Sequence, residues 1–201
     1  METFSSSKFW DERYKKGETS GTGSYGILCD FKNETLNNFI KENKITELYD
    51  MGYGDGNQIE GLKVNNYIGL DVSPTACKMC NDKYKGDKTK KFHLYMNTPL
   101  EGMYEKRDLA ISLDVIYHLV EDDIYNMYMK NLFNLSKKYV IIYSNDTETN
   151  LPGRHMRCRK FTDHVVNNYP KWRLLKKIKN KYPELTSADF YIYIKDDEWR
   201  C

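Results

Sequence analysis

The chain has few of the features that place a protein in a membrane or outside the cell. Its longest strongly apolar run, residues 139–143, is far shorter than the roughly 20 residues that a membrane-spanning helix needs. Segment 1–7 lacks the charged and apolar regions of a secretory signal peptide. Cysteines number only five, an odd count in a chain of 201 residues, which can build a core without disulfides. We therefore expect no membrane span, reduced thiols and a cytoplasmic location.

Net charge is almost absent as well. The formal charge of +2 gives no overall indication of a nucleic-acid binder. The basic residues are unevenly spread, because segment 154–181 holds ten Lys or Arg and one acid, a local balance of +9 that leaves −7 elsewhere. Internal repeats and low-complexity linkers are also missing. We expect a single domain over residues 1–201, with one short basic stretch.

Apolar periodicity indicates alternating strands and helices. The pattern predicts helices over 31–42 and 122–135, and strands over 47–51, 67–71, 92–95, 108–113 and 139–143. Such alternation favours a parallel sheet with crossover helices. Strand-like segments 172–179 and 188–195 follow each other across a short loop, and this arrangement predicts an antiparallel hairpin. The fold class is therefore α/β, a mostly parallel seven-stranded sheet with a C-terminal antiparallel hairpin.

A glycine-rich loop follows the first strand. In the segment Asp50-Met-Gly-Tyr-Gly-Asp-Gly56 the glycines let the backbone turn sharply and approach a ligand closely. Asp71 ends the second strand about 20 residues later, where a carboxylate suits both hydroxyls of a ribose. The spacing differs from that of NAD enzymes, and Asp50 would repel a pyrophosphate. A ligand with a ribose and an amino-acid end, such as S-adenosylmethionine (SAM), fits better.

Three segments resemble motifs of class I SAM-dependent methyltransferases, the Rossmann-like sandwich family. These are Leu48-Tyr-Asp-Met-Gly-Tyr-Gly-Asp-Gly56, Tyr67-Ile-Gly-Leu-Asp-Val-Ser73 and Asp108-Leu-Ala-Ile-Ser-Leu-Asp-Val-Ile-Tyr-His118. The resemblance covers nearly the whole chain and implies a catalytic core over 45–201. It implies SAM as cofactor and the following binding residues: Asp50, Gly52, Gly54, Gly56, Asp71, Val72, Asn97 and Leu113. Asn97 stands where many members have an acid that contacts the adenine amine.

Residues 1–30 are interpreted as a lid. The segment Phe9-Trp-Asp-Glu-Arg-Tyr14 resembles the N-terminal helix of many small methyltransferases, which covers the methionine end of the cofactor. A hydroxyl-bearing glycine loop, Ser20-Gly-Thr-Gly-Ser-Tyr-Gly26, follows it. We therefore expect Tyr14 and Ser24 to contact the cofactor. A disordered approach to the core is the alternative.

Two histidines are candidates for catalysis. Asp114 and His118 lie four residues apart at the end of the fourth strand, where the family's methyl group is transferred. An alcohol acceptor needs its proton removed, and histidine or aspartate can remove it. His155 is the second candidate, within a cluster of arginines that we expect to bind substrate through phosphate or hydroxyl groups, unless this is a solvated basic loop. The predicted catalytic residues are Asp114, His118 and His155, and the predicted substrate-binding residues are Arg154, Arg157 and Arg159.

The acceptor class comes from a finer resemblance. The lid loop, Ser112-Leu-Asp-Val-Ile-Tyr-His-Leu-Val-Glu-Asp-Asp123 and Arg159-Lys-Phe-Thr-Asp163 are similar to small methyltransferase domains found beside glycosyltransferases in bacteria and large DNA viruses, above all chloroviruses. That resemblance implies O-methylation of a glycan hydroxyl, for example on a terminal deoxyhexose such as rhamnose, and glycosyltransferase domains as partners in the same pathway or polypeptide. If viral, the protein acts in the host cytoplasm.

Three alternatives stay open at this stage. An RNA or cap methyltransferase is suggested by the +9 stretch, although we expect no nucleic-acid partner. A SAM-binding module without catalysis is the second. A metal site near the fourth and fifth strands is the third, and we expect none, because the sequence has no cluster of acids and amides there beyond Asp114, Asn145 and Asp146. A zinc site is not expected either, because Cys77 and Cys80 form an isolated CxxC.

Overall fold

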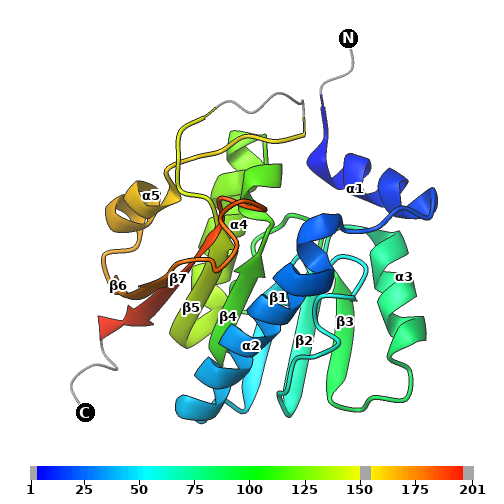
Figure 1. The fold of residues 1–201 in the computed structure, drawn as a ribbon, viewed down its shortest axis with the longest axis horizontal. Helices are drawn as coiled ribbons and strands as arrows, with labels where there is room; N and C mark the ends of the chain where they lie inside the picture. The colour runs from blue at the N-terminus through cyan, green and yellow to red at the C-terminus, as the bar shows by residue number, and fades with distance from the viewer. Residues whose placement is uncertain (1–3, 150–154, 197–201) are drawn as a thin grey trace.

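A seven-stranded sheet forms the centre of the molecule (Figure 1). The structure, a computed structural model, describes residues 4–149 and 155–196. The strand order is β3-β2-β1-β4-β5-β7-β6. The pairs among β1 to β5 are parallel, whereas β7 is antiparallel to both β5 and β6. The strands are β1 (Glu47–Met51), β2 (Asn66–Asp71), β3 (Lys90–Leu94), β4 (Arg107–Leu113), β5 (Ser136–Ser144), β6 (Trp172–Ile178) and β7 (Asp189–Lys195).

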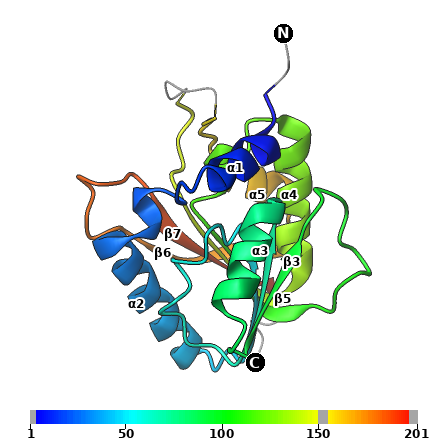
Figure 2. The same ribbon diagram turned by 90° about the vertical axis from the view of Figure 1, so that its right-hand side faces the viewer.

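Helices cover both faces of this sheet (Figure 2). One apolar cluster packs α1, α2 and α3 on one face, and a second packs α4 and α5 on the other. Consecutive strand residues divide between the two, as Leu48 and Tyr49 do, because side chains alternate across a strand. The helices are α1 (Ser6–Lys15), α2 (Gly26–Glu42), α3 (Pro74–Lys83), α4 (Asp122–Leu135) and α5 (Phe161–Asn168), with 3-10 turns η1 (Thr22–Ser24) and η2 (Ile116–His118).

Local sequence explains where two of the helices begin. Ser73 caps α3 by accepting a hydrogen bond from the backbone N–H of Ala76, and Pro74 occupies the first turn. Acidic Asp122 and Asp123 open α4, where they complement the positive end of the helix dipole. Helix α2 has no side-chain cap at Tyr25. It starts at Gly26, five residues before the predicted helix, and so includes Lys32 in its second turn.

The topology confirms the predicted fold class, a mostly parallel sheet closed by a C-terminal hairpin. In that hairpin Leu174 pairs with Tyr193 and Ile178 with Phe190. The strand β7 lies between β5 and β6, and its apolar side chains alternate between the two apolar clusters, so they are buried on both faces of the sheet. Strand β6 forms the edge of the sheet and carries exposed lysines. No helix within 4–149 or 155–196 is long and apolar enough to cross a membrane.

Candidate active site

A cavity opens at the carboxyl ends of β1, β2 and β4 and is lined in part by α1. Figure 1 shows α1 lying above these strand ends. The cavity holds about 740 Å³ of space not filled by atoms, part of which is open solvent at its mouth. Open parallel sheets bind ligands at this edge, where neighbouring crossovers leave a crevice. The wall is made by Ser6, Trp10, Tyr14, Ser20, Ser24, Gly52, Tyr53, Gly54, Gln58, Leu70, Asp71, Val72, Tyr95, Asn97, Leu113, Asp114, Val115, His118, Leu119 and Tyr128.

The glycine loop packs too tightly for side chains. Gly52 and Gly54 both have positive φ, +85° and +62°, and both line the cavity. A Cβ atom on Gly52 would lie 2.6 Å from Val115, and one on Gly54 would meet Ser20 and come within 2.9 Å of the Tyr14 hydroxyl. Both positions therefore need glycine for conformation and for space.

Asp71 lies in this wall with its carboxylate already oriented. Its Oδ2 accepts a hydrogen bond from the backbone N–H of Gly54, and its Oδ1 accepts one from Ser73, both at 2.9 Å. Burial raises the pKa of Asp71 to about 6, although these hydrogen bonds oppose the shift. Each carboxylate oxygen keeps a further lone pair, so Asp71 can still accept from ligand hydroxyls.

Two residues predicted to bind the cofactor lie outside the cavity wall. Asp50 is completely buried and accepts a hydrogen bond from the Tyr67 hydroxyl at 2.9 Å, and burial raises its pKa to about 7. Its other oxygen, Oδ1, has no hydrogen-bond partner among the described residues. Gly56 faces α3 instead, since a Cβ there would lie 2.7 Å from the Cys80 sulfur. The absence of a side chain at Gly56 thus lets α3 pack closely, and Asp50 contacts Tyr67 of β2 rather than the cavity.

One end of the cavity lies beyond β2. Val72 and Asn97, which follow β2 and β3, line it together with Tyr95. Asn97 has φ +52°, a left-handed conformation that asparagine tolerates better than most residues. Leu113 lines the middle of the cavity at the end of β4. The structure thus brings the predicted residues 72, 97 and 113 to one cavity.

The N-terminal segment is tied to the glycine loop. Ser20 and Asp55 bond reciprocally: Ser20 N–H donates to the Asp55 carboxylate at 2.7 Å, and Asp55 N–H donates to Ser20 Oγ at 2.9 Å. The Tyr14 hydroxyl lies 3.1 Å from Ser20 Oγ. On α1, Asp11 accepts from the Ser73 hydroxyl at 2.7 Å. Sequence reasoning missed Asp11 and Asp55, because their partners are distant in the chain.

His118 is the histidine that lines the cavity. Its Nδ1 lies 3.1 Å from the backbone carbonyl oxygen of His155. A carbonyl only accepts, so Nδ1 carries the proton and Nε2 keeps its lone pair. Burial lowers the pKa of His118 to about 4, although the bond to His155 opposes the shift. Trp10 packs edge-on against His118, with ring centroids 4.7 Å apart.

His155 lies behind His118 rather than in the cavity wall. Its ring stacks on Phe9 at 4.9 Å and lies 6.0 Å from the His118 ring, centroid to centroid. The structure therefore gives His155 a backbone hydrogen bond to His118, a stacking contact with Phe9 of α1, and a more distant stacking contact with the His118 ring.

Asp114 lines the cavity next to a buried lysine that sequence reasoning missed. Lys32 of α2 is completely buried, and its Nζ lies 2.5 Å from Oδ2 of Asp114. Lys32 also donates to Oε1 of Gln58, and the Tyr117 hydroxyl donates to Oδ1 of Asp114 at 3.0 Å. Asp114 itself has φ +60°. No local pattern marks Lys32, since it sits in an ordinary amphipathic helix.

The arginines predicted to bind substrate have protein partners. Arg157 and Arg159 both pair with Asp122, at 2.8 Å and 3.0 Å. Arg159 also donates to the Leu119 carbonyl at 2.6 Å, and its guanidinium lies over the Tyr125 ring. These arginines join the loop before α5 to the start of α4 and do not line the cavity. Arg154 lies outside the described residues.

Two further features bear on the predicted chemistry. The described cysteines, Cys29, Cys77, Cys80 and Cys158, are free thiols. Cys77 and Cys80 both lie on α3, and Cys80 is fully buried. Within the part of the chain that the structure describes, no group of three or more His, Cys, Asp or Glu side chains is placed to hold a metal ion.

Comparison with known proteins identifies the fold. No family model and no curated protein matches the sequence. The structure matches the N-methyltransferase NodS from Bradyrhizobium japonicum WM9, solved with S-adenosyl-L-homocysteine, at a TM-score of 0.70 and 10% identity over 96% of this chain and 99% of that one. It matches magnesium protoporphyrin IX methyltransferase from Synechocystis PCC 6803 with bound SAM at 0.66 and 10% identity over 97% and 99%.

A third solved structure is the methyltransferase domain of bacterial CtHen1. It matches at a TM-score of 0.64 and 18% identity, over 82% of this chain and 98% of that domain. At such identities the matches show the fold alone. The chain therefore has the Rossmann-like fold of class I methyltransferases. The three matched proteins are an N-methyltransferase, a magnesium protoporphyrin IX methyltransferase and a methyltransferase domain.

Proposed function

We propose that this protein is a SAM-dependent O-methyltransferase that transfers a methyl group to a sugar hydroxyl of a glycan. The observation that carries the proposal is one continuous cavity. It joins a glycine loop and Asp71, at the ends of β1 and β2, to an uncharged histidine, His118, after β4. Enzymes of this fold transfer methyl groups, and several solved neighbours carry SAM or its product.

The residues present suit SAM. Asp71 offers acceptor lone pairs for two ribose hydroxyls. It lies next to Gly54, where no side chain keeps a ligand away from the backbone. Val72 and Asn97 would flank the base, and Tyr14 and Ser24 would cover the cofactor from the lid side. When bound, SAM supplies an electrophilic methyl group on a sulfonium. The protein's main task is then to align an acceptor oxygen with that methyl group.

His118 supports a hydroxyl acceptor over an amine. A neutral amine carries its own lone pair, whereas a hydroxyl becomes a good nucleophile only as its proton leaves. His118 is neutral at physiological pH, and its Nε2 lone pair is left free by the bond from Nδ1 to His155. We infer that His118 takes the proton of the acceptor and that the His155 carbonyl holds its ring in place.

The glycan acceptor rests on the sequence resemblance to glycosyltransferase-associated domains, together with one feature of the cavity. Its acceptor end, beside His118, is lined by Trp10, Ser6 and Leu119. An indole ring can pack against the apolar face of a sugar, and a serine hydroxyl can bond to its polar edge. We propose a glycan or glycoside with a terminal deoxyhexose such as rhamnose, made by glycosyltransferases of the same pathway, and a cytoplasmic location.

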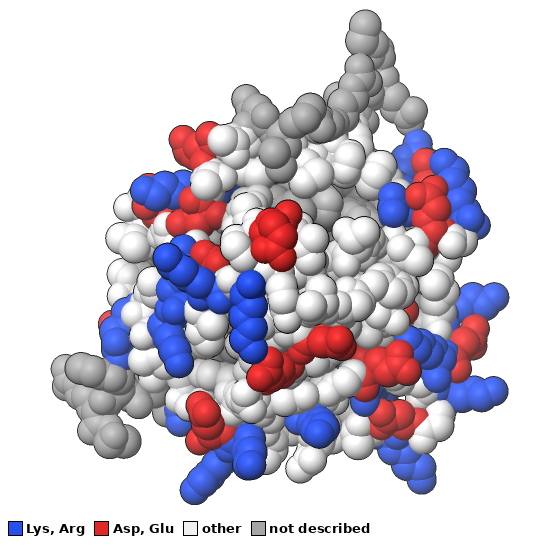
Figure 3. All heavy atoms as spheres, in the orientation of Figure 1, with Lys and Arg blue, Asp and Glu red and all other residues white. Residues whose placement is uncertain are grey.

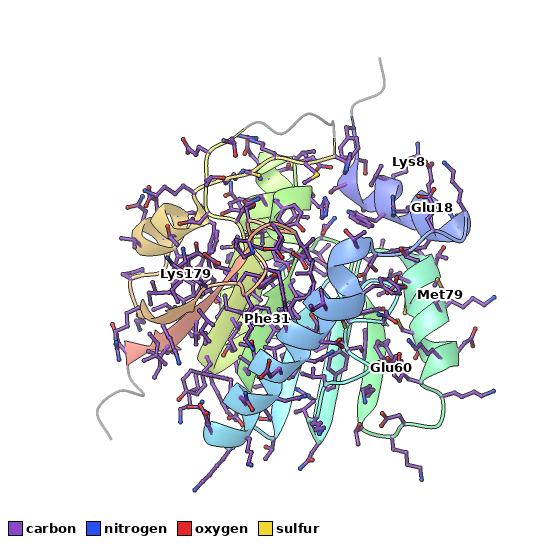
Figure 4. All side chains as sticks on the ribbon, viewed as in Figure 1. Lys8, Glu18, Phe31, Glu60, Met79 and Lys179 are labelled. Atoms are coloured by element: carbon purple, nitrogen blue, oxygen red, sulfur yellow. The ribbon has the colours of Figure 1, made fainter. Side chains whose placement is uncertain are left out.

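The basic stretch gives little support to an RNA acceptor. Lys176 and Lys177 lie on edge strand β6, and Figure 4 places Lys179 beside β6 and α5, away from α1. Figure 3 shows Lys and Arg side chains gathered over the β6 side and, separately, around α1 and α3, with uncharged and acidic side chains between them. Arg157 and Arg159 are paired with Asp122. The charges therefore do not form a continuous track to the cavity mouth on this face.

A competition assay tests the proposal. The protein is incubated with isotopically labelled SAM and three acceptor classes: oligosaccharides, nucleotide sugars and RNA. We expect label in a sugar acceptor and none in RNA. Label only in RNA, with binding that weakens steeply as salt rises, would establish the RNA alternative. SAM binding without transfer to any acceptor would support the non-catalytic module.

A further inference from the structure

We propose that Gln58 and Asp114, both oriented by the buried Lys32, form the subsite that receives the aminocarboxylate end of SAM. This inference rests on the proposed function, because it assigns a part of the same cavity. It reinterprets Asp114, which the sequence predicted as catalytic, as a cofactor-binding residue. It also assigns roles to Lys32 and Gln58, which no sequence motif singled out.

The starting point is the burial of Lys32. Its side chain has no exposed surface, and an isolated buried ammonium is strongly unfavourable. Its Nζ meets two acceptors, Oδ2 of Asp114 at 2.5 Å and Oε1 of Gln58, and lies 5.1 Å from the centre of the Tyr143 ring. Replacing a buried pair by apolar side chains often leaves stability unchanged, so stability alone does not account for this cluster. Both of its acceptors line the cavity.

Lys32 settles the orientation of the Gln58 amide. An ammonium group only donates, so the oxygen of that amide must face Lys32 and its NH₂ group must point elsewhere. Gln58 is 5% exposed and lines the cavity, and no described residue accepts a hydrogen bond from its Nε2. A donor held in this way suits a carboxylate.

Lys32 and Tyr117 likewise fix the Asp114 carboxylate. Lys32 binds Oδ2 and the Tyr117 hydroxyl binds Oδ1, so both oxygens are held while each keeps a second lone pair. The backbone of Asp114 adopts φ +60°, and its N–H donates to the Tyr143 carbonyl at 3.0 Å. Strained backbone of this kind is typical of functional sites. A fixed carboxylate is suited to an ammonium group.

The position of the pair agrees with the amino-acid end of the cofactor. A Cβ on Gly23 would lie 3.1 Å from Oδ2 of Asp114, so the lid loop lies directly over this carboxylate. Asp71 ends β2, whereas Asp114 follows β4, and β1 lies between these strands. The ribose and amino-acid ends would therefore bind on opposite sides of the glycine loop. The NH₂ donor of Gln58 suits the carboxylate of the zwitterionic amino-acid end, and the Asp114 carboxylate suits its ammonium group.

The contribution of this subsite can be measured by comparing the affinities of two ligands. S-adenosylhomocysteine carries the aminocarboxylate, and 5′-methylthioadenosine lacks it but keeps the nucleoside. In Gln58→Glu the new carboxylate still accepts from Lys32, but the NH₂ donor is replaced by a repelling oxygen. By calorimetry we expect S-adenosylhomocysteine to bind about tenfold more weakly or worse, as for a lost hydrogen bond to a charged group, while methylthioadenosine changes by less than about twofold.

Asn97→Asp is the matched control. It adds the same charge to the cavity wall beyond β2, so we expect the ratio of the two affinities to stay as in the wild type. Lys32→Met should change the ratio in the same direction as Gln58→Glu; if Lys32→Met does not fold, as judged by circular dichroism, Gln58→Glu decides.

The outcomes distinguish an error in the proposed function from an error in the subsite assignment. If the wild type binds neither ligand, the proposed function is wrong. If it binds both and Gln58→Glu weakens both equally, or neither, the proposed function stands and this subsite assignment is overturned.

Discussion

The Nδ1 atom of His118 donates a hydrogen bond to the backbone carbonyl oxygen of His155, 3.1 Å away. This contact links the turn after β4 to the loop before α5, two segments 37 residues apart. It fixes the tautomer of the cavity-lining histidine without using the imidazole of His155. The two histidines that the sequence offered as candidates therefore differ in position: the His118 ring lines the cavity, whereas His155 contributes its backbone carbonyl to hold that ring.

Replacing His118 should separate catalysis from cofactor binding. His118→Asn keeps an N–H donor close to the position of Nδ1 but has no counterpart of the Nε2 lone pair. We expect kcat to fall by about 10²-fold or more, the usual effect of losing a general base. The dissociation constant for S-adenosylhomocysteine, measured by calorimetry, should stay within about twofold, well under the 1.4 kcal/mol of a tenfold change.

His155→Ala is the matched control for this variant. It leaves the backbone carbonyl that His118 uses and removes the ring, which stacks on Phe9 and lies 6.0 Å from the His118 ring. We expect most of kcat to remain. An equal loss of kcat in both variants would show that the His155 ring takes part in the reaction and that our division of roles is wrong.

Cofactor affinity should depend on pH through Asp71. Burial raises the pKa of this carboxyl to about 6, so it gains a proton as the pH falls through that value. A neutral carboxyl is a weaker acceptor for two hydroxyls. Below pH 6 we expect affinity for S-adenosylhomocysteine to fall, by up to about tenfold per pH unit.

Asp71→Asn provides the reference for this titration. It should bind weakly at every pH, and its affinity should lack the step near pH 6. The measurement is calorimetry from about pH 5 to pH 7.5, across the window in which the shifted group titrates. A step that persists in Asp71→Asn would assign the titration to another group.

Gly54→Ala should disturb the lid as well as the loop. Gly54 and Gly102 both have positive φ, +62° and +78°, so alanine strains the backbone at either site by roughly 1–2 kcal/mol. Only at Gly54 does the added Cβ meet Ser20 and Tyr14; at Gly102 nothing lies within 4 Å. We expect Gly54→Ala to lose roughly 1–3 kcal/mol more in the free energy of unfolding than Gly102→Ala. Equal losses would mean that the lid does not pack on the glycine loop.

Asp50 should make the free protein less stable as the pH rises. Its pKa is raised by burial to about 7 in the folded state, above the ordinary value of 3.8. Between these values the unfolded chain releases the proton more readily, so this group's contribution falls from about pH 4 to about pH 7. Asp50→Asn keeps an acceptor for Tyr67 and should lose this dependence. Chemical unfolding of both proteins along the pH series checks it, and parallel curves would contradict it.

Much of the fold could be predicted because its signals are local. The apolar strands, the acidic start of α4 and the hairpin all follow from short segments, and the bounds of β1 and α4 agree with the prediction. The start of α2 was missed because Tyr25 offers no side-chain cap. The order of the strands in the sheet is not encoded in any single segment. It depends on how the connections between parallel strands cross over, which they do with a right-handed turn.

The site was only partly predictable, because the sequence reveals local motifs but not contacts between distant segments. Asp71, Gly52 and Gly54 belong to a local motif and line the cavity, whereas Lys32 reaches Asp114 from 82 residues away in the sequence. Arg157 and Arg159 were predicted to face substrate because clustered arginines often bind anions. Asp122, which pairs with both, lies on another element, so the sequence did not reveal this pairing.

The central claim is tested most directly by locating the methyl group in a product. The wild-type protein is incubated with SAM labelled in its methyl group and an oligosaccharide ending in rhamnose, and the product is fragmented in a mass spectrometer. Our account predicts the label on a sugar oxygen, with little product from His118→Asn and Asp71→Asn. No labelled oligosaccharide, label on a nitrogen, or undiminished product from both variants would contradict it.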